Sequence, residues 1–190
     1  MNAKSDRRVK YTKLMLKESL MELMEKKPIS KITIKEICEN ADINRCTFYS
    51  YYKDQYDLLE QIEDELICEI NTMLSNYNYK QDATEAVQMM EQIFQYIAEN
   101  SGFCRILLSE QGDVHFQKRV MVIAQRQHVI EWTTQRDMDA ETAEYLYLFA
   151  VNGSIGMVQN WLKNGMNLSN RKMAEMIIKM TNQGLAAFVK

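Results

Sequence analysis

Scarcity of helix-breaking residues is the strongest constraint that this sequence places on its fold. The 190 residues include one proline, Pro28, and six glycines. Proline and glycine are the residues that most often interrupt helices and mark turns. Because 46% of the residues are hydrophobic, the chain has enough apolar side chains for a core and is not typical of a disordered protein. We therefore expect an all-α protein with about nine helices.

Apolar residues that recur every three or four positions place these helices along the chain. Pro28 ends the first helix, and Thr33 with Glu36 forms a capping box that starts the second. Asn44 and Asp54 are suitable N-caps for the next two helices. The expected helices cover residues 5–26, 33–41, 45–51, 54–74, a segment after a polar break at 75–82, 103–109, 114–135, 139–163 and 169–189.

Charge divides the chain into a basic head and an acidic body. Residues 1–53 carry twelve basic and seven acidic side chains, a net charge of +5, whereas the whole chain is at −3. A basic segment on an acidic protein indicates that this segment alone meets a polyanion. No apolar run reaches the ~18 residues of a membrane span, and the N-terminus does not resemble a secretory signal. Four scattered cysteines and two histidines are typical of reduced thiols, so we expect a cytoplasmic protein without a membrane partner.

Residues 32–54, ITIKEICENADINRCTFYSYYKD, contain two short helices joined by a three-residue turn. This pattern predicts a helix-turn-helix, whose second helix enters the major groove of DNA. Phe48 and Tyr52 lie four residues apart and are expected to pack inward, whereas Tyr49 and Tyr51 point elsewhere, beside Arg45. A tyrosine hydroxyl on an exposed aromatic ring suits a phosphate oxygen. The alternative is an ordinary helical hairpin whose tyrosines are half-buried.

The same stretch resembles the signature of the TetR/AcrR family of bacterial transcriptional regulators. The resemblance covers about the first third of the chain and lies at Thr33, residues 41–43, Thr47-Phe48-Tyr49, Tyr52, Lys53 and Leu58-Leu59. Two positions depart from the family pattern. Asp42 stands where the family pattern has a glycine in the turn. Aspartate tolerates a left-handed backbone better than most residues, so the turn can still form. Cys46 stands where the family pattern has a small residue. This difference is expected to change which bases are preferred rather than how the helix docks on DNA.

The resemblance implies a DNA-binding domain over residues 1–54 and a helical effector-binding and dimerisation domain over residues 55–190. It implies DNA contacts by the second short helix and its flanks. The expected contact residues are Thr33, Asn44, Arg45, Cys46, Thr47, Tyr49, Ser50, Tyr51 and Lys53. We expect Lys53 to hold a phosphate with its side chain and the amides of the following helix. The arm around Arg7, Arg8 and Lys10 is either a further DNA contact or a solvated tail.

The last two long helices have apolar stripes interrupted by small residues. A glycine inside a helix costs ~1 kcal/mol relative to alanine, which suggests that another helix approaches there. The resemblance implies that these helices form a four-helix bundle with a second copy, and a homodimer matches a palindromic operator. The expected interface residues are Phe149, Gly153, Ser154, Gly156, Trp161, Met173, Ile177, Met180, Gly184 and Phe188. The alternative is that these stripes form the core of one chain.

The middle helices would hold any pocket for a small apolar or amphipathic effector. The candidates are Met89, Ile93, Tyr96, Phe103, Leu107, Phe116, Ile123, Trp132, Tyr147 and Met157, for which core packing is the alternative. No catalytic set, metal-ligand spacing or phosphate loop is visible, so we expect no enzyme, no cofactor and no metal.

Three functions follow from these features. The first is a homodimeric repressor that an effector releases from its operator. The second is a TetR-like regulator, either a repressor or an activator, that a partner protein controls. The segments SGFCRILLSEQGDVHFQKRV and WLKNGM resemble a subgroup that includes a regulator of dihydroxyacetone kinase operons. The third is a helical adaptor or enzyme that keeps a helix-turn-helix as a scaffold.

Overall fold

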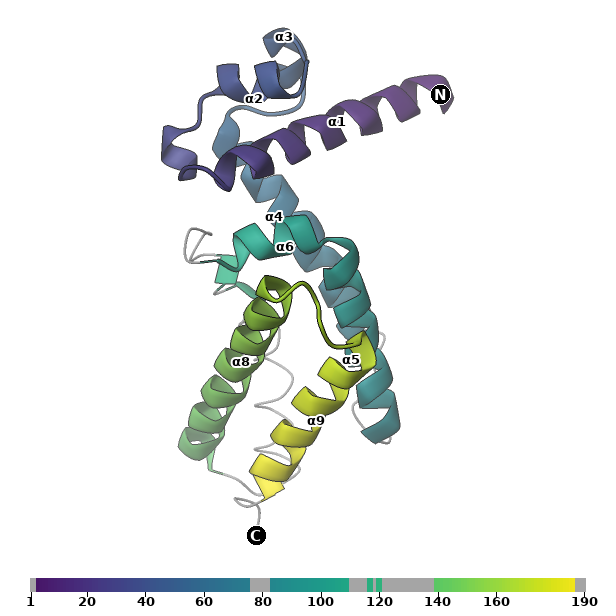
Figure 1. Ribbon diagram of the computed structural model, residues 1–190, viewed down its shortest axis with the longest axis vertical. Coiled ribbons are helices and arrows are strands. Elements are labelled where there is room, and N and C mark those ends of the chain that lie inside the picture. The colour runs from purple at the N-terminus through teal and green to yellow at the C-terminus, as the bar shows by residue number, and fades with distance from the viewer. Residues whose placement is uncertain (1–2, 76–82, 110–115, 118, 121–138, 187–190) are drawn as a thin grey trace. The chain divides into compact units, whose positions relative to one another are not determined.

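A computed structural model describes residues 3–75, 83–109, 116–117, 119–120 and 139–186 (Figure 1). These residues form helices and no strand, which confirms the expected all-α class. The chain divides into two compact units, which we call the N-terminal unit (residues 1–66) and the C-terminal unit (residues 67–190). The expected functional boundary at residue 54 stays a prediction. Helix α4 (Gln55–Ser75) contributes residues to both units.

The N-terminal unit contains α1 (Ala3–Met24), a single 3₁₀ turn η1 (Ile29–Lys31), α2 (Ile34–Asn40), α3 (Arg45–Tyr49) and the first part of α4. Its core consists of apolar side chains that recur at helical spacing and are almost wholly buried, namely Leu16, Leu20, Met24, Ile32, Ile37, Phe48, Tyr52, Leu58, Leu59 and Ile62. One buried polar group joins two of these helices, because the Ser19 hydroxyl donates a hydrogen bond to the Ile37 carbonyl at 2.8 Å.

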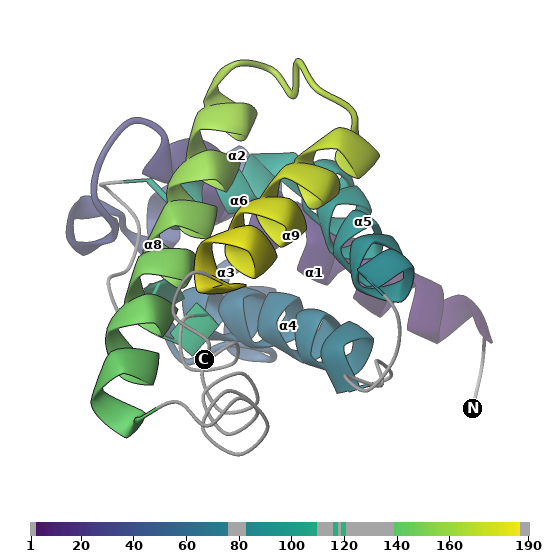
Figure 2. The same cartoon turned by 90° about the horizontal axis from the view of Figure 1, so that it is seen from below.

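The C-terminal unit contains the end of α4, α5 (Ala83–Glu99), α6 (Ser101–Leu107), α8 (Ala140–Lys163) and α9 (Asn170–Ala186). Helix α9 packs along α5, as both views show (Figure 1 and Figure 2). The sequence predicts a helix over residues 103–109, whereas α6 begins two residues earlier, at Ser101. Asn100 separates α5 from α6 instead, because its backbone and side-chain N–H groups both donate to the Tyr96 carbonyl and close the last turn of α5.

Two aromatic residues hold the core of the C-terminal unit. Phe94 and Trp161 meet edge to face with ring centroids 5.1 Å apart, and the indole N–H of Trp161 donates to the Leu168 carbonyl at 2.9 Å. Gly165 has a φ of +69° and ends α8 in a Schellman turn, in which the N–H of Met166 bonds to the Trp161 carbonyl. This turn sends the chain back from α8 to α9.

The expected helix over residues 114–135 lies almost entirely outside the described residues. The other expected helices are present, with ends that differ by a few residues from those expected. None of the described helices combines the length and the apolar character needed to cross a bilayer.

Candidate nucleic-acid interface

The start of α2 is a complete capping box. The Glu36 N–H donates to Thr33 Oγ1 at 3.3 Å, and Glu36 Oε2 accepts both the Thr33 N–H at 3.0 Å and the Thr33 hydroxyl at 2.8 Å. Lys27 Nζ donates to the other carboxylate oxygen at 2.6 Å. The Lys27 and Thr33 hydrogen bonds lower the pKa of Glu36 to about 2. The capping box is therefore confirmed, and the Thr33 hydroxyl is engaged in it.

The turn between α2 and α3 depends on a left-handed residue at position 42. Asp42 has a φ of +52°, the region in which aspartate is more tolerated than most other side chains. The Ile43 N–H then reaches back to the Cys38 carbonyl at 2.9 Å. Asn44 caps α3 as expected, because its side-chain oxygen accepts the Cys46 N–H at 2.8 Å. The chain thus makes the turn of a helix-turn-helix without the usual glycine.

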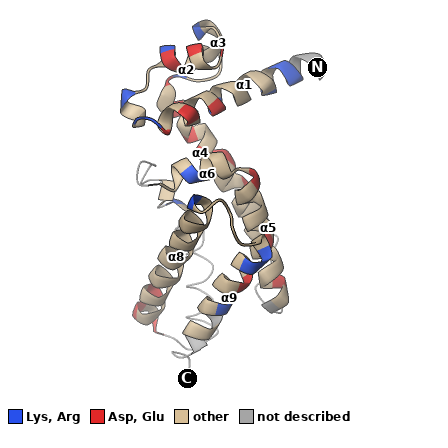
Figure 3. Ribbon diagram, viewed as in Figure 1, with Lys and Arg blue, Asp and Glu red and all other residues tan. Residues whose placement is uncertain are grey.

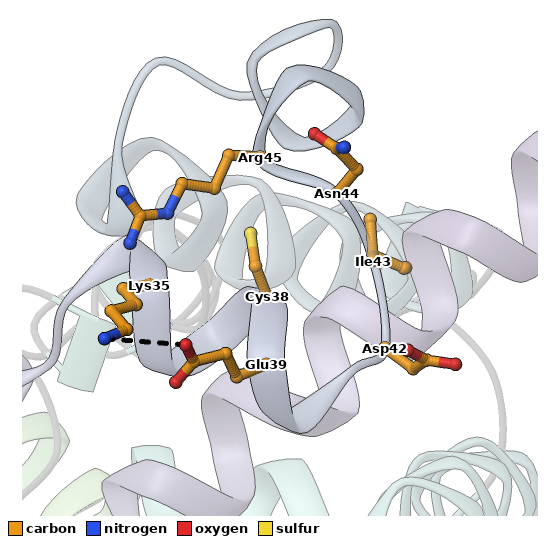
Figure 4. A pocket seen from close by; sticks show the side chains of 7 residues that line it. All are labelled: Lys35, Cys38, Glu39, Asp42, Ile43, Asn44 and Arg45. Atoms are coloured by element: carbon orange, nitrogen blue, oxygen red, sulfur yellow. Dashed lines mark ion pairs between the residues drawn. The ribbon is translucent and has the colours of Figure 1, made fainter.

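An open groove lies beside this turn and is lined by Lys35, Cys38, Glu39, Asp42, Ile43, Asn44 and Arg45. Figure 4 shows the Arg45 guanidinium extending from the first turn of α3 on the same side of the groove as Lys35. Lys35 Nζ lies 3.7 Å from Glu39 Oε1. Burial raises the pKa of the Cys38 thiol, and the nearby Arg45 charge partly offsets this effect. The groove is a mixed-charge surface at the leading end of α3.

The four aromatic residues of α3 and its C-terminal flank divide between core and surface. Phe48 and Tyr52 are buried, at 0% and 2% exposure, which confirms that these two pack inward. Tyr49 is 58% exposed and Tyr51 is half-buried. The buried pair anchors a helix of five residues, which is too short to be stable by its own hydrogen bonds. The remaining side chains of α3 are left available on its outer face.

The nine expected DNA-contact residues all come from the N-terminal unit. The exposed members are Thr33, Asn44, Arg45, Cys46, Tyr49, Ser50 and Lys53, and the half-buried members are Thr47 and Tyr51. The Ser50 hydroxyl donates to the Cys46 carbonyl at 2.9 Å. The structure thus brings these side chains together on and around α3, while their contacts with DNA stay predictions.

Three amides near Lys53 are already engaged within the chain, contrary to the expectation that they hold a phosphate. The Lys53 N–H donates to Asp57 Oδ2 at 2.8 Å. Asp54 Oδ1 accepts the N–H groups of Tyr56 and Asp57, each at 2.9 Å. The Lys53 hydrogen bond is also the main reason why the pKa of Asp57 is lowered. The exposed side chain of Lys53 is available to a phosphate, whereas the N–H groups of Lys53, Tyr56 and Asp57 are already engaged.

Basic side chains surround this surface. Figure 3 shows lysine and arginine at the beginning of α1 and around η1, α2 and α3. Arg7, Arg8 and Lys10 are exposed on the first turns of α1. Lys13, three residues after Lys10, was missed in the sequence, although its Nζ lies 5.5 Å from the centroid of the Tyr51 ring. No spacing within α1 indicates this contact, because its two residues are 38 positions apart in the sequence.

The expected pocket residues lie mainly inside the C-terminal unit. Met89, Ile93, Leu107, Phe116 and Tyr147 are buried, and burial raises the pKa of Tyr147 to about 12. Tyr96, Phe103 and Met157 are half-buried, whereas Ile123 and Trp132 lie outside the described residues. The buried members belong to an apolar interior, and the role of the whole set as an effector site stays a prediction.

The expected dimer-interface residues divide into two groups. Phe149, Gly153, Gly156, Met180 and Gly184 are exposed, Ser154 is half-buried, and Phe188 lies outside the described residues. Trp161, Met173 and Ile177 are instead buried within the chain, with exposures of 2%, 3% and 6%. Their side chains already pack inside the C-terminal unit, so the exposed members are the ones that present a free surface.

The fold and the α3 surface define a helix-turn-helix regulator, and comparison with known proteins identifies its family. The TetR family model described as "Transcriptional regulator C-terminal region" matches residues 84–183. The chain belongs to the TetR family of transcriptional regulators. This membership confirms the resemblance seen in the sequence and the expectation that the chain is not an enzyme.

Individual relatives agree with this membership. An uncharacterized HTH-type transcriptional regulator, YxbF of Bacillus subtilis (strain 168), is 35% identical over 51 residues, which are 27% of this chain and 13% of that protein. The dihydroxyacetone kinase operon activator DhaS has a similar fold, with a TM-score of 0.59 at 16% identity over 94% of this chain and 98% of that one. The regulator FadR from Bacillus subtilis, solved in complex with stearoyl-CoA, has a TM-score of 0.66 at 13% identity over 90% of this chain and 98% of that one.

Proposed function

We propose that this protein is a cytoplasmic homodimeric repressor that binds a palindromic operator and is released by a small apolar or amphipathic effector. The observation that carries DNA binding is the outer face of α3, where Arg45, Cys46, Tyr49 and Ser50 are exposed while Phe48 is buried beneath them. Polar side chains on a short helix that is anchored from below suit contact with base edges and phosphates in the major groove.

Within this proposal the residues of the α3 surface have different tasks. Arg45, Cys46 and Ser50 face the bases, and Arg45 suits the bidentate hydrogen bonds that guanine offers in the major groove. Thr47, Tyr49, Tyr51 and the Lys53 side chain meet phosphates. Thr33 and Asn44 place the backbone of α2 and α3 against the DNA, since both side chains are engaged in helix caps.

The exposed apolar face of α8 supports the homodimer. Tyr145 and Phe149 lie one turn apart and are 68% and 76% exposed, which is unusual for large apolar side chains unless a partner covers them. A Cβ added at Gly153 or Gly156 would meet no described atom within 4 Å. Because the described residues give no packing reason for glycine at these two positions, we infer that a helix of a second copy approaches there. Exposed Met180 on α9 extends this surface.

Sedimentation of a matched pair of variants tests the dimer. Phe149→Glu places a charge in the inferred interface and should shift the protein from dimer to monomer. Leu168→Glu places the same charge on an exposed apolar residue of the α8–α9 connection and should leave the dimer intact. A wild-type protein that sediments as a monomer at micromolar concentration would contradict the proposal.

The apolar interior of the C-terminal unit supports an effector of apolar or amphipathic character. Half-buried Tyr96, Phe103 and Met157 lie beside buried residues of α5, α6 and α8, and methionine adapts readily to ligands of different shapes. FadR, which shares the fold, was solved with stearoyl-CoA. An effector would act by favouring an arrangement of the dimer whose heads no longer match the operator.

Operator selection is the experiment that tests the proposed function. Purified protein is incubated with random duplex DNA, the bound sequences are recovered, and binding to the best sequence is titrated with salt. We expect a palindrome whose half-sites are ~34–36 Å apart, with affinity that falls steeply as salt rises. Stearoyl-CoA is the first probe for release. Recovery of no preferred sequence would contradict the proposal, and binding that resists every candidate effector would contradict its repressor mechanism.

A second candidate is an activator of the same fold that a partner protein controls. The fold similarity to DhaS, an operon activator, extends over almost the whole of both chains, and the exposed apolar face of α8 suits a protein as well as a second copy. A reporter gene behind the selected operator separates the candidates. Deletion of the regulator raises expression if the protein is a repressor and lowers it if the protein is an activator.

A further inference from the structure

The aromatic residues at the end of α3 form a continuous chain of ring contacts. The ring centroids of Tyr49 and Phe48 are 5.7 Å apart, those of Phe48 and Tyr52 are 5.6 Å apart, and those of Tyr52 and Tyr51 are 6.4 Å apart. Tilted and edge-to-face contacts at these distances are attractive. The exposed Tyr49 is therefore connected, through the core, to Tyr51 on the other side of the helix end.

Lys13 of α1 contacts the last two rings of this series. Its Nζ lies 5.5 Å from the centroid of the Tyr51 ring and 5.9 Å from that of the Tyr52 ring, both within the range of cation–π attraction. Lys13 and Tyr51 are half-buried and Tyr52 is buried, so water screens the contact less than it would at an exposed site. Burial raises the pKa of Tyr52 to about 12, which keeps its phenol neutral and directs the attraction to the ring.

The neighbouring lysine on α1 is engaged elsewhere, which leaves Lys13 to contact the two rings. Lys17, one turn further along α1, is paired with Glu65 of α4. Tyr51 and Tyr52 each donate their backbone N–H to the Phe48 carbonyl at 2.9 Å, and the Ser50 hydroxyl donates to the Cys46 carbonyl. These hydrogen bonds close the helix end but do not tie it to α1. Side-chain contacts tie it to α1, and the Lys13 contact with the two rings is one of them.

We propose that Lys13 is a positioning residue for DNA binding, which holds Tyr51 and Tyr52 and thereby fixes the end of α3 in the geometry that presents Tyr49 and Lys53 to the phosphates. This inference rests on the proposed DNA-binding function. Lys13 acts through the two rings rather than on the DNA itself. A lysine that contacted a phosphate directly would contribute to the release of counterions, and this difference makes the two roles separable.

The first test compares Lys13→Met and Lys13→Arg on the selected operator. Lys13→Met keeps an unbranched apolar chain without the charge and should weaken binding about threefold, with no change in the slope of log affinity against log salt. Lys13→Arg keeps a cation over the rings and should restore binding. Lys26→Met is the matched control, because Lys26 is an exposed lysine that follows α1 and contacts neither ring. A slope smaller by about one in Lys13→Met would identify a direct phosphate contact and overturn the proposal.

The second test is a double-mutant cycle between Lys13→Met and Tyr51→Leu, measured by operator binding and by urea unfolding. If Lys13 acts through Tyr51, its effect should shrink by at least half when the ring is absent. If Lys13→Met weakened binding as much in the Tyr51→Leu background as in the wild type, and the wild type bound the operator, this inference alone would be overturned. If the wild type bound no duplex, the proposed function would fail, whereas a coupling seen in urea unfolding would show that the Lys13–Tyr51 contact itself holds.

Discussion

Phe48 and Tyr49 are adjacent aromatic residues of α3, one buried and one exposed, and replacing each by alanine should have different consequences. Phe48 is wholly buried, and truncating a buried phenylalanine to alanine costs about 3–5 kcal/mol. Domains have about 5–15 kcal/mol of stability in total, and a unit as small as residues 1–66 is near the lower end. Phe48→Ala should therefore unfold much of the N-terminal unit at 25 °C.

Tyr49→Ala should leave the N-terminal unit folded but weaken DNA binding. Because Tyr49 is mostly exposed, the variant loses little beyond one edge contact with Phe48, about 0.5–1.5 kcal/mol. A hydrogen bond to a charged group contributes about 1.5–3 kcal/mol, so losing the proposed phosphate contact should reduce operator affinity at least tenfold.

Both variants are measured by urea unfolding with circular dichroism and by operator binding with fluorescence anisotropy. Hydrogen exchange of the amides of residues 34–52 assigns the change to the N-terminal unit. The reasoning would be refuted if Phe48→Ala cost less than about 1 kcal/mol, since that result is incompatible with a fully packed side chain. It would also be refuted if Tyr49→Ala bound the operator as tightly as the wild type.

Three further predictions concern the turn, the cap and the core. Asp42→Gly should raise the free energy of unfolding by up to ~1 kcal/mol and Asp42→Val should lower it, because a φ of +52° strains any side chain. The urea midpoints of the two variants and the wild type test this, and equal midpoints would count against a strained turn. The Glu36 pKa lies near 2, below its ordinary value of 4.5, so its charge stabilises the fold above pH 4.5 and this contribution is lost as the pH falls toward 2. The melting temperatures of wild type and Glu36→Gln should thus differ at pH 7 and converge near pH 2, and a constant difference would argue against the Lys27 pairing. Trp161→Phe should cost about 1 kcal/mol in thermal unfolding, because the Leu168 carbonyl loses its N–H donor, and an unchanged stability would show that water replaces it.

Features that depend on residues close together in the chain could be predicted from residue type and spacing alone. Thr33 and Glu36 are three residues apart, and Asn44 caps the amide of Cys46 two residues later, so the helix starts were readable from residue type and spacing. The inward pair Phe48 and Tyr52 was readable for the same reason, since helical periodicity alone puts them on one face. The family signature lies in this same stretch.

Contacts between residues far apart in the sequence became known only from the packed fold. Lys13 meets the rings of Tyr51 and Tyr52 across 38 residues of sequence, and no periodicity within α1 specifies that contact. The apolar stripe of α8 could not be divided from sequence either, because a helix face buried within the chain and one buried by a second copy have the same pattern. Trp161 proved to be inside and Phe149 outside. Burial is a property of the whole packed unit, and that is why it could not be read from the spacing of residues along one helix.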